Sequence, residues 1–474
     1  MVLTKHLFKS LILILATSVL QTANAQDETS YWYFGANAGI SFIEGEPIVR
    51  LNGALNVWEG CASISTSSGD LLFYTDGIHV YDSSHKEMPN GYGLLGDPSS
   101  AQSSLVIPKP NDDPKFYIFT IDDIDSGGGF QGLNFTLVDM TLNDSLGDVV
   151  ATEKNVNLTQ PLCEKLTAVG HINGIDTWVI TQKWGTNNFY TYLVTDQGVD
   201  TIPIISSSGV EVGGPGTGID VAKGYMKVSH DGNKIAKANA GLRMIEIFDF
   251  DNSTGIISNG FSDDDLGGEP YGIEFSTNNR FLYVSSWKSN PGMFLYQYDL
   301  DAGSHEDVKN SRITISSELN GALQLAPDNR IYVANAQSKY LSRINEPNKL
   351  GENCDFEVEA LYLEGRDCMW GLPNFLSKPS DTTVGVKQLK SNESVTLHIY
   401  PNPVDDHLTI QIVRSQIGIK SIAIYNSNGL KIKDLVISED QEIIFNTSKW
   451  THGMFVAVVH RKDGEVGKRK FIVR

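Results

Sequence analysis

The sequence predicts an all-β protein in two parts, a seven-bladed β-propeller followed by a small immunoglobulin-like β-sandwich. No stretch of residues 31–375 sustains helical periodicity over twelve residues. Turn residues recur every eight to twelve positions, which is typical of sandwiches, barrels and propellers. One strand-and-turn unit recurs along the body, and this repetition favours the propeller. Six or eight blades are the alternatives to seven.

Residues 1–25 have the pattern of a signal peptide. Lys5, His6 and Lys9 form a positive start, residues 10–20 are apolar, and small residues at 23–25 precede Gln26. The apolar run is too short for a bilayer core of ~30 Å. No later stretch reaches eighteen apolar residues, so we expect no transmembrane segment in the mature chain.

The predicted propeller body spans residues 26–376. Each unit has an apolar strand, a polar turn, a second strand, a loop and a third strand, at intervals of roughly 45–60 residues that suit propeller blades. Six units are found, at residues 61–84, 103–143, 164–198, 224–255, 270–303 and 321–351. A seventh can be built from both ends of the body, with residues 369–376 as the innermost strand and residues 31–42 as outer strands. Closing the ring in this way removes exposed sheet edges.

A polar linker at 377–394 leads to the predicted sandwich at 395–474. Pro401, Asn402 and Pro403 form an opening that cannot be a helix or a central strand. Asn428-Gly429 and Asp463-Gly464 are hairpin turn pairs between short alternating strands, and Gly453 opens the last pair of strands. Many short strands in about eighty residues favour a sandwich.

This C-terminal part resembles the sorting domain of type IX secretion substrates of the Bacteroidetes group. The resemblance rests on Tyr400 to Pro403, the central "IYNSNGLKI" and the run from Gly453 to Val473. It implies an address that is recognised by the type IX secretion machinery and commonly removed at the cell surface. The expected location is therefore the cell surface or the medium, reached through the periplasm. An ordinary immunoglobulin-like appendage is the alternative.

The body resembles a propeller-like domain common in Bacteroidetes surface proteins, including gliding-motility-associated ones. The matching segments are "YWYFG" (31–35), "GDLLFYTDG" (69–77), "EKLTAVGH" (164–171) and "GLPNF" (371–375). This resemblance implies a surface location and no particular reaction.

The acidic charge of the chain lies in the body. The net charge of the whole chain is −20, and residues 26–394 hold 24 basic and 49 acidic residues. Such a surface argues against a nucleic-acid partner, because binding phosphates requires clustered Lys and Arg. It is compatible with solubility, with cations or with a basic partner.

The four cysteines are an even number, which is compatible with disulfides in an exported chain. Cys354 and Cys368 flank one predicted strand and are the preferred pair. Cys61 and Cys163 either form a second pair or stay buried and reduced.

Three glutamates are candidates for a binding site. Glu59, Glu164 and Glu269 each precede the first strand of a unit and are spaced 105 residues apart. In a propeller they would gather at one mouth of the central channel, where Ca²⁺ would suit several carboxylates. The plainer interpretation is three turn acids, each bonded to the backbone of a neighbouring blade.

Other candidate residues do not form a complete catalytic or metal-binding motif. Asp249 and Asp251 begin like a calcium loop, but Thr254 and Gly260 stand where such loops need Gly and Glu. The sequence has no recognisable catalytic triad, P-loop or dinucleotide motif. Structural roles are expected for His171 and His230. Sugar stacking and inter-blade packing are both open for four tryptophans, Trp58, Trp184, Trp287 and Trp370.

The sequence therefore predicts a non-enzymatic surface propeller that binds a glycan or a protein. The alternative is a propeller hydrolase or lyase that acts on an extracellular glycan with carboxylates at the channel mouth. The fold does not decide between them, because propellers host both kinds of function.

Overall fold

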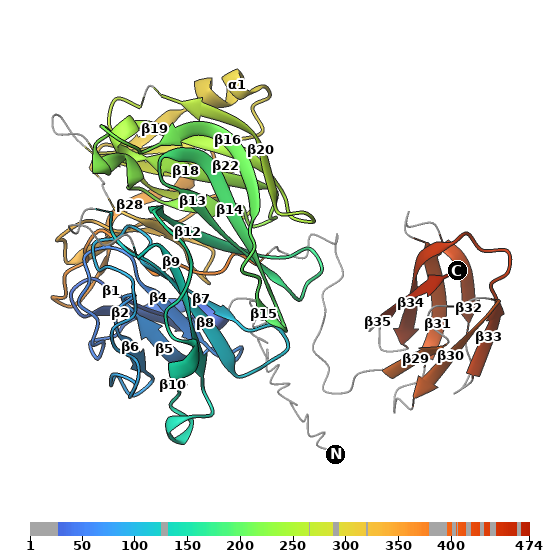
Figure 1. Ribbon diagram of the computed structural model, residues 1–474. Helices are drawn as coiled ribbons and strands as arrows, with labels where there is room; N and C mark the ends of the chain where they lie inside the picture. The colour runs from blue at the N-terminus through green and yellow to red at the C-terminus, as the bar shows by residue number, and fades with distance from the viewer. Residues whose placement is uncertain are drawn as a thin grey trace, which may run out of the picture. The chain divides into compact units, whose positions relative to one another are not determined.

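The computed structural model describes residues 27–124, 131–264, 266–287, 293–318, 321–378, 396–400, 404, 406–413, 419–426, 431–436, 442–461 and 466–474. The chain divides into two compact units, Met1–Asp381 and Thr382–Arg474 (Figure 1). The predicted signal peptide and most of the predicted linker lie outside the described residues, as do Pro401, Asn402, Pro403 and Gly429.

Small antiparallel sheets make up the first unit, seven of them within its described residues. The first two have three strands each: β1 (Tyr31–Phe34), β2 (Ala38–Glu44) and β3 (Glu46–Val49), then β4 (Ala62–Ser65), β5 (Leu71–Thr75) and β6 (Val80–Asp82). The next two have five each: β7 (Ser104–Pro108), β8 (Lys115–Ile121), β9 (Leu133–Asp139), β10 (Asp148–Val149) and β11 (Val156–Thr159), then β12 (Leu162–Gly170), β13 (Thr177–Lys183), β14 (Thr186–Thr195), β15 (Gly198–Val199) and β16 (Ile204–Val212).

The last three sheets of this unit have four strands each. They are β17 (Met226–Val228), β18 (Lys234–Asn239), β19 (Met244–Asp251) and β20 (Ile256–Asp263); β21 (Glu269–Phe275), β22 (Phe281–Trp287), β23 (Phe294–Asp299) and β24 (Ile313–Ser316); and β25 (Leu323–Leu325), β26 (Ile331–Val333), β27 (Tyr340–Ile344) and β28 (Phe356–Tyr362). The helix α1 (His305–Asn310) is short and begins at a Ser304 capping box.

Burial explains the order of strands within each sheet. The first strand is covered on both faces, as in β12 and β17, where nearly every residue is buried. The last strand alternates or is largely exposed, as in β16 and β28. The first strands therefore form the interior of this unit and the last strands its rim.

A turn repeated in three successive sheets confirms the internal repeat. Gly232, Asn279 and Asn329 stand at equivalent positions with φ of 73°, 62° and 64°. Each backbone N–H donates to the carbonyl three residues earlier, at 2.9 Å. Gly and Asn tolerate this left-handed conformation better than other residues, so the sequence fixes the turn.

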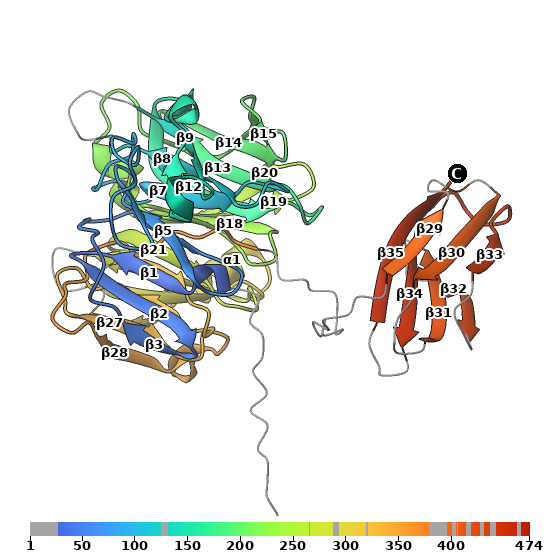
Figure 2. The ribbon, with the colours of Figure 1, turned by 90° about the horizontal axis from the view of Figure 1, so that it is seen from below.

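Each sheet touches the next, and the last sheet touches the first. The first strands contact one another in chain order, from β1 and β4 through β7, β12, β17 and β21 to β25. Trp32 on β1 and Phe42 on β2 then pack on Tyr332 of β26, with ring centroids 5.8 and 5.5 Å away. Figure 2 shows β1 to β3 beside β27 and β28. This cyclic arrangement is propeller-like.

The segment at residues 369–378, here called the strap, differs from the expected innermost strand of a seventh blade. It forms no ladder with β1, β2 or β3 in the described structure. It runs instead along other first strands, with parallel bridges from Pro373 to Cys61 and from Ser377 to Val169. Gly371 permits the close approach, because a Cβ there would lie 1.8 Å from the Glu59 carbonyl oxygen.

The second unit consists of two sheets around one core in its described part. The first sheet contains β29 (Thr396–Tyr400), β30 (His407–Val413) and β33 (Glu442–Asn446). The second contains β32 (Lys431–Val436), β31 (Ile419–Asn426), β34 (Gly453–Arg461) and β35 (Val466–Val473). The core side chains come from both sheets and include Leu408, Ile410, Ile424 and Phe455. Gly453 begins β34 with φ of 143°.

The structure also differs from the predicted Cys354–Cys368 disulfide. All four cysteines are free and buried. Cys354 packs in a core with side chains of β22, β23, β25, β26 and β27, whereas Cys368 belongs to the core around Trp32 that also contains Cys61. Proximity in sequence was the basis of that prediction, and the chain carries the two residues into different cores.

Candidate functional site

The first strands β4, β12 and β21 begin near one end of the ring, here called the first mouth. Backbone hydrogen bonds join the beginnings of neighbouring first strands, from Gly60 before β4 to Ser100 before β7, and from Tyr225 before β17 to Tyr271 in β21. The strap begins there as well, because Trp370 N–H donates to the Trp58 carbonyl and the Trp370 carbonyl accepts from Ala322. The first mouth therefore collects residues from most of the sheets.

Glu59 is a partly exposed carboxyl group at this mouth. It accepts a hydrogen bond from the Tyr271 hydroxyl at 2.9 Å. Burial raises the pKa of Glu59 to about 7, against the opposing effects of the Tyr271 hydrogen bond and the Lys223 charge. The side chain is therefore partly protonated at neutral pH and can both donate and accept hydrogen bonds.

Glu164 lies close to Glu59 but is fully buried. Its Oε2 accepts from the Ala101 N–H at 3.0 Å. Burial raises the pKa of Glu164 well above its usual range, and the neighbouring Glu59 charge raises it further. Glu164 is thus a buried, structural partner of Glu59.

Glu269 has other neighbours. Burial and the Asp220 charge raise its pKa, while Arg243 and Lys223 lower it. Of the three glutamates singled out in the sequence, the structure brings Glu59 and Glu164 together, and Glu269 lies beside a different set of charges. Lys223 links the two groups electrostatically, since burial opposes its charge while Asp220, Glu164 and Glu59 favour it.

Aromatic side chains adjoin Glu59. The Trp370 ring packs edge-on against Tyr271 at 5.5 Å and against Trp287 at 6.4 Å between centroids. Trp287 is 36% exposed, and Trp58, next to Glu59 in sequence, is 48% exposed. Exposed indole faces beside a hydrogen-bonding carboxyl are suited to the apolar faces and hydroxyls of a sugar.

Three other residues that the sequence suggested as candidates, Trp184, His171 and Asp251, make contacts that stabilise the fold. Trp184 packs on Gly213, where a Cβ would meet its ring at 2.3 Å. His171 packs on Trp178 with ring centroids 5.2 Å apart. The Asp251 carboxylate accepts from Ser253 and Thr254 within its own turn. No group of three or more His, Cys, Asp or Glu in the described part of the chain could hold a metal ion.

Several residues of the first mouth were not expected from the sequence. Tyr271, Lys223, Asp97 and Asp123 were not singled out, although the charges of both aspartates raise the pKa of Glu59. Tyr271 stands two residues after Glu269, so the unit alignment that selected the glutamates could have selected it. The mutual approach of loops before different first strands has no signal in a single sequence.

Comparison with known proteins identifies the C-terminal part. Residues 398–474 match the family model described as the secretion system C-terminal sorting domain. This match supports a type IX secretion substrate and indicates a secreted or outer-membrane cell-surface location. No helix of the described residues is long and apolar enough to cross a membrane. A search of curated proteins finds no match.

Solved structures share a general likeness with the chain. A proposed 6-phosphogluconolactonase from Bacteroides uniformis aligns at 12% identity and a TM-score of 0.41, over 66% of this chain and 91% of that one. Hydrazine synthase from Kuenenia stuttgartiensis aligns at 10% identity and a TM-score of 0.39, over 76% of this chain and 92% of that one. The periplasmic gluconolactonase of Pseudomonas aeruginosa aligns at 12% identity and a TM-score of 0.32, over 73% of this chain and 93% of that one. Because every TM-score is below 0.5, these likenesses carry no activity to this chain.

Proposed function

We propose that this protein is an exported surface propeller that binds a glycan at the first mouth. The observation that carries the proposal is the partly exposed carboxyl of Glu59, bonded to Tyr271 in an aromatic group that continues through Trp370 to the exposed Trp287. Sugar rings stack on indole faces through their C–H groups, and their hydroxyls bond to carboxyl groups.

The proposal includes a finer architecture. Seven sheets in cyclic contact support a seven-bladed propeller at 26–376, entered after a signal peptide at 1–25. Two sheets around one core support an immunoglobulin-like sandwich at 395–474, joined through a linker at 377–394. In this architecture Pro401, Asn402, Pro403, Gly429 and Gly453 belong to the sorting signal.

A glycosidase or lyase is the second candidate. The pKa of Glu59, raised to about 7, is in the range of a general acid. A glycosidase also needs a second carboxyl group on the other side of the scissile bond. Glu164 is fully buried and holds the Ala101 N–H, so it does not face a substrate. This difference favours binding over hydrolysis.

A Ca²⁺ ion at the three glutamates has less support than a glycan. Apart from Lys223, Glu269 has different charged neighbours from Glu59. Burial raises the pKa of Glu164, which disfavours the charged form that a cation needs. Calorimetry with CaCl₂ tests this directly, and the proposal predicts no saturable heat.

A glycan-array screen of the purified protein tests the proposed function. We expect selective binding that is weakened about fivefold in Trp287→Ala and is also weakened in Glu59→Gln, while the packed Trp184→Phe variant, as a matched control, binds like the wild type. Each stacked aromatic contributes on the order of 1 kcal/mol, a factor of about five in affinity. An array with no selective signal, or equal binding by Trp287→Ala, would contradict the proposal.

A further inference from the structure

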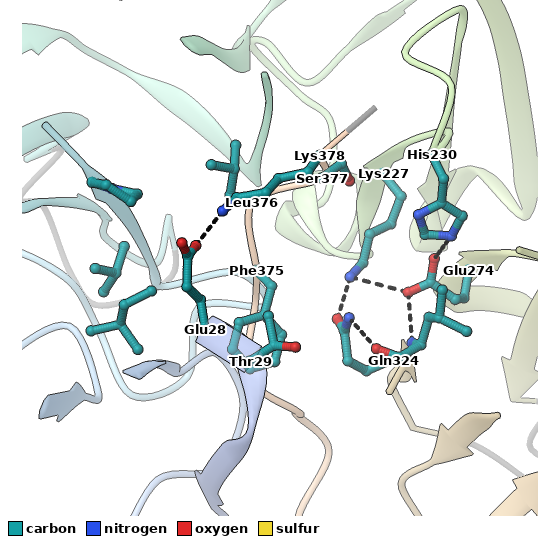
Figure 3. Close-up of a pocket in the computed structure, with 14 residues that line it drawn as sticks. Glu28, Thr29, Lys227, His230, Glu274, Gln324, Phe375, Leu376, Ser377 and Lys378 are labelled. Carbon is teal, nitrogen blue, oxygen red and sulfur yellow. Dashed lines mark hydrogen bonds and ion pairs between the residues drawn. The ribbon is translucent and has the colours of Figure 1, made fainter. Parts of the chain in front are cut away.

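A pocket that is separate from the first mouth lies where the first strands end. Here called the second-mouth pocket, it is lined by Lys227, Glu274, Gln324, Phe375, Lys378 and Glu28, among others. Figure 3 shows Lys227, Gln324, Glu274 and His230 on one side of it, Glu28 on the other, and Phe375 and Thr29 between them. It shares no residue with Glu59 and its aromatic neighbours.

The carboxylate on the charged side is already satisfied. Glu274 Oε1 accepts from the Phe275 N–H at 2.9 Å and Oε2 from the Leu325 N–H at 3.1 Å. Lys227 Nζ lies 3.4 Å from Oε2 and His230 Nε2 lies 3.7 Å from Oε1. Glu274 therefore joins neighbouring sheets and has little capacity left to accept from a ligand.

Donor capacity remains in the pocket. The ammonium group of Lys227 has three N–H groups, and its partners among the described residues are the Gln324 amide oxygen and Glu274. The Lys227 side chain is only 4% exposed, so a further acceptor would meet a positive charge shielded from water. Lys378, which is paired with Glu28, adds a second ammonium group at the rim.

The remaining walls are apolar and the space is small. Ile64, Val106, Pro108, Phe375 and Leu376 form these walls. The cavity volume is about 50 Å³, room for roughly three or four water molecules at ~10–15 Å³ each. A ligand of a few non-hydrogen atoms with one anionic end and one short apolar end matches both the walls and the volume.

We propose that the second-mouth pocket binds a short-chain monocarboxylate such as acetate or propionate. The carboxylate accepts from the Lys227 and Lys378 ammonium groups, and the alkyl end packs on Phe375 and the apolar wall. The buried Lys227 donor beside an occupied Glu274 favours an anion over a cation, and the Glu28 carboxylate of the pocket is paired with Lys378. The strap contributes Phe375, Leu376, Ser377 and Lys378 to the lining of this pocket.

Propionate binding to the full chain tests the proposal. Titration with ¹³C-carboxyl propionate followed by NMR should give a saturable shift in the millimolar range. Propionamide has the same shape without the charge, and it should bind at least tenfold more weakly, since hydrogen bonds to charged groups are the stronger ones. Equal binding of propionamide, or no saturation by either compound, would overturn the proposal.

Variants locate the site. Lys227→Met should weaken propionate at least tenfold and Lys378→Met about threefold, because the rim charge is half exposed. Lys223→Met, the same change at the first mouth, should leave propionate affinity unchanged. Should Lys227→Met not fold, Leu376→Trp narrows the pocket without changing its charge and should abolish binding. Wild-type affinity in Leu376→Trp, or equal losses in Lys223→Met, would refute the assigned pocket.

Discussion

At the scale of single residues, burial decides what the acids of the first mouth can do. Glu59 and Glu164 both have raised pKa values, but only Glu59 is exposed enough to meet a ligand. Glu164 serves the fold by holding the Ala101 N–H. Glu59 and Glu164 thus occupy equivalent positions in the repeated units but have different roles, one at the surface and one in the core.

The raised pKa of Glu59 makes stability depend on pH. Its pKa in the folded state, about 7, lies above the ordinary value of 4.5. The unfolded state thus loses its proton first, and the free energy of unfolding falls as pH rises from about 4.5 to 7. Glu59→Gln should remove about 1–2 kcal/mol of this fall, allowing for its partial exposure. Urea unfolding at pH 5 and pH 8, followed by tryptophan fluorescence, measures the effect.

The control for this experiment is Asp112→Asn. Hydrogen bonds from Lys109 and Lys115 lower the pKa of Asp112, so this variant should keep the fall between pH 5 and pH 8. A Glu59→Gln protein with the wild-type slope would show that Glu59 is ionised throughout this range.

The cysteines give a second prediction at this scale. All four are buried as free thiols, and burial raises the pKa of Cys163 and Cys354 to about 11. We expect no alkylation by iodoacetamide in the native protein and four adducts after denaturation without reductant. A mass with only two adducts would instead reveal a disulfide.

At the scale of elements, the strap connects the two mouths. Its Gly371 lies against the Glu59 carbonyl, and its Trp370 belongs to the aromatic group of the first mouth. Gly371→Ala should push the strap away from β4, lower stability by about 3 kcal/mol and weaken glycan binding. Gly218→Ala is the matched control, because a Cβ there meets nothing within 4 Å and its φ is −69°. Thermal unfolding of both variants measures the difference, and equal midpoints would contradict the account of the strap.

Buried charges hold neighbouring sheets together. Lys237 on β18 pairs with Glu246 on β19 at 2.8 Å and donates to Gln182 on β13 at 2.9 Å, with both charged side chains almost fully buried. Lys237→Met leaves Glu246 buried without its cation and should cost about 3–5 kcal/mol. Glu246→Leu added to that variant should recover part of the loss. Urea midpoints of the single and double variants give the comparison, and an additive double variant would deny the coupling.

At the scale of the whole molecule, the sequence predicts much of the fold and less of the site. Apolar first strands, the repeated turn at Gly232, Asn279 and Asn329, and the sorting-domain pattern are local signals, and they hold in the structure. The strap pairing and the loop contacts around Glu59 are long-range, since Tyr271 reaches Glu59 across 212 residues. A single sequence has no record of such contacts, so the second-mouth pocket and the bond between Tyr271 and Glu59 emerge only in three dimensions.

The C-terminal match gives a prediction about export. A chain lacking residues 398–474 should accumulate as a folded body in the periplasm of a host with type IX secretion, because the machinery has lost its signal. Cell fractionation and resistance of the retained body to protease measure both properties. Surface display of the truncated chain would contradict the role of this domain.

The central claim is that the first mouth binds a sugar. The most direct measurement is a crystal structure of the protein soaked with its best array oligosaccharide. The account predicts a sugar ring stacked on Trp287, Trp370 or Trp58, with a hydroxyl within hydrogen-bonding distance of the Glu59 carboxyl. Sugar density elsewhere on the body, with the first mouth empty, would contradict the claim.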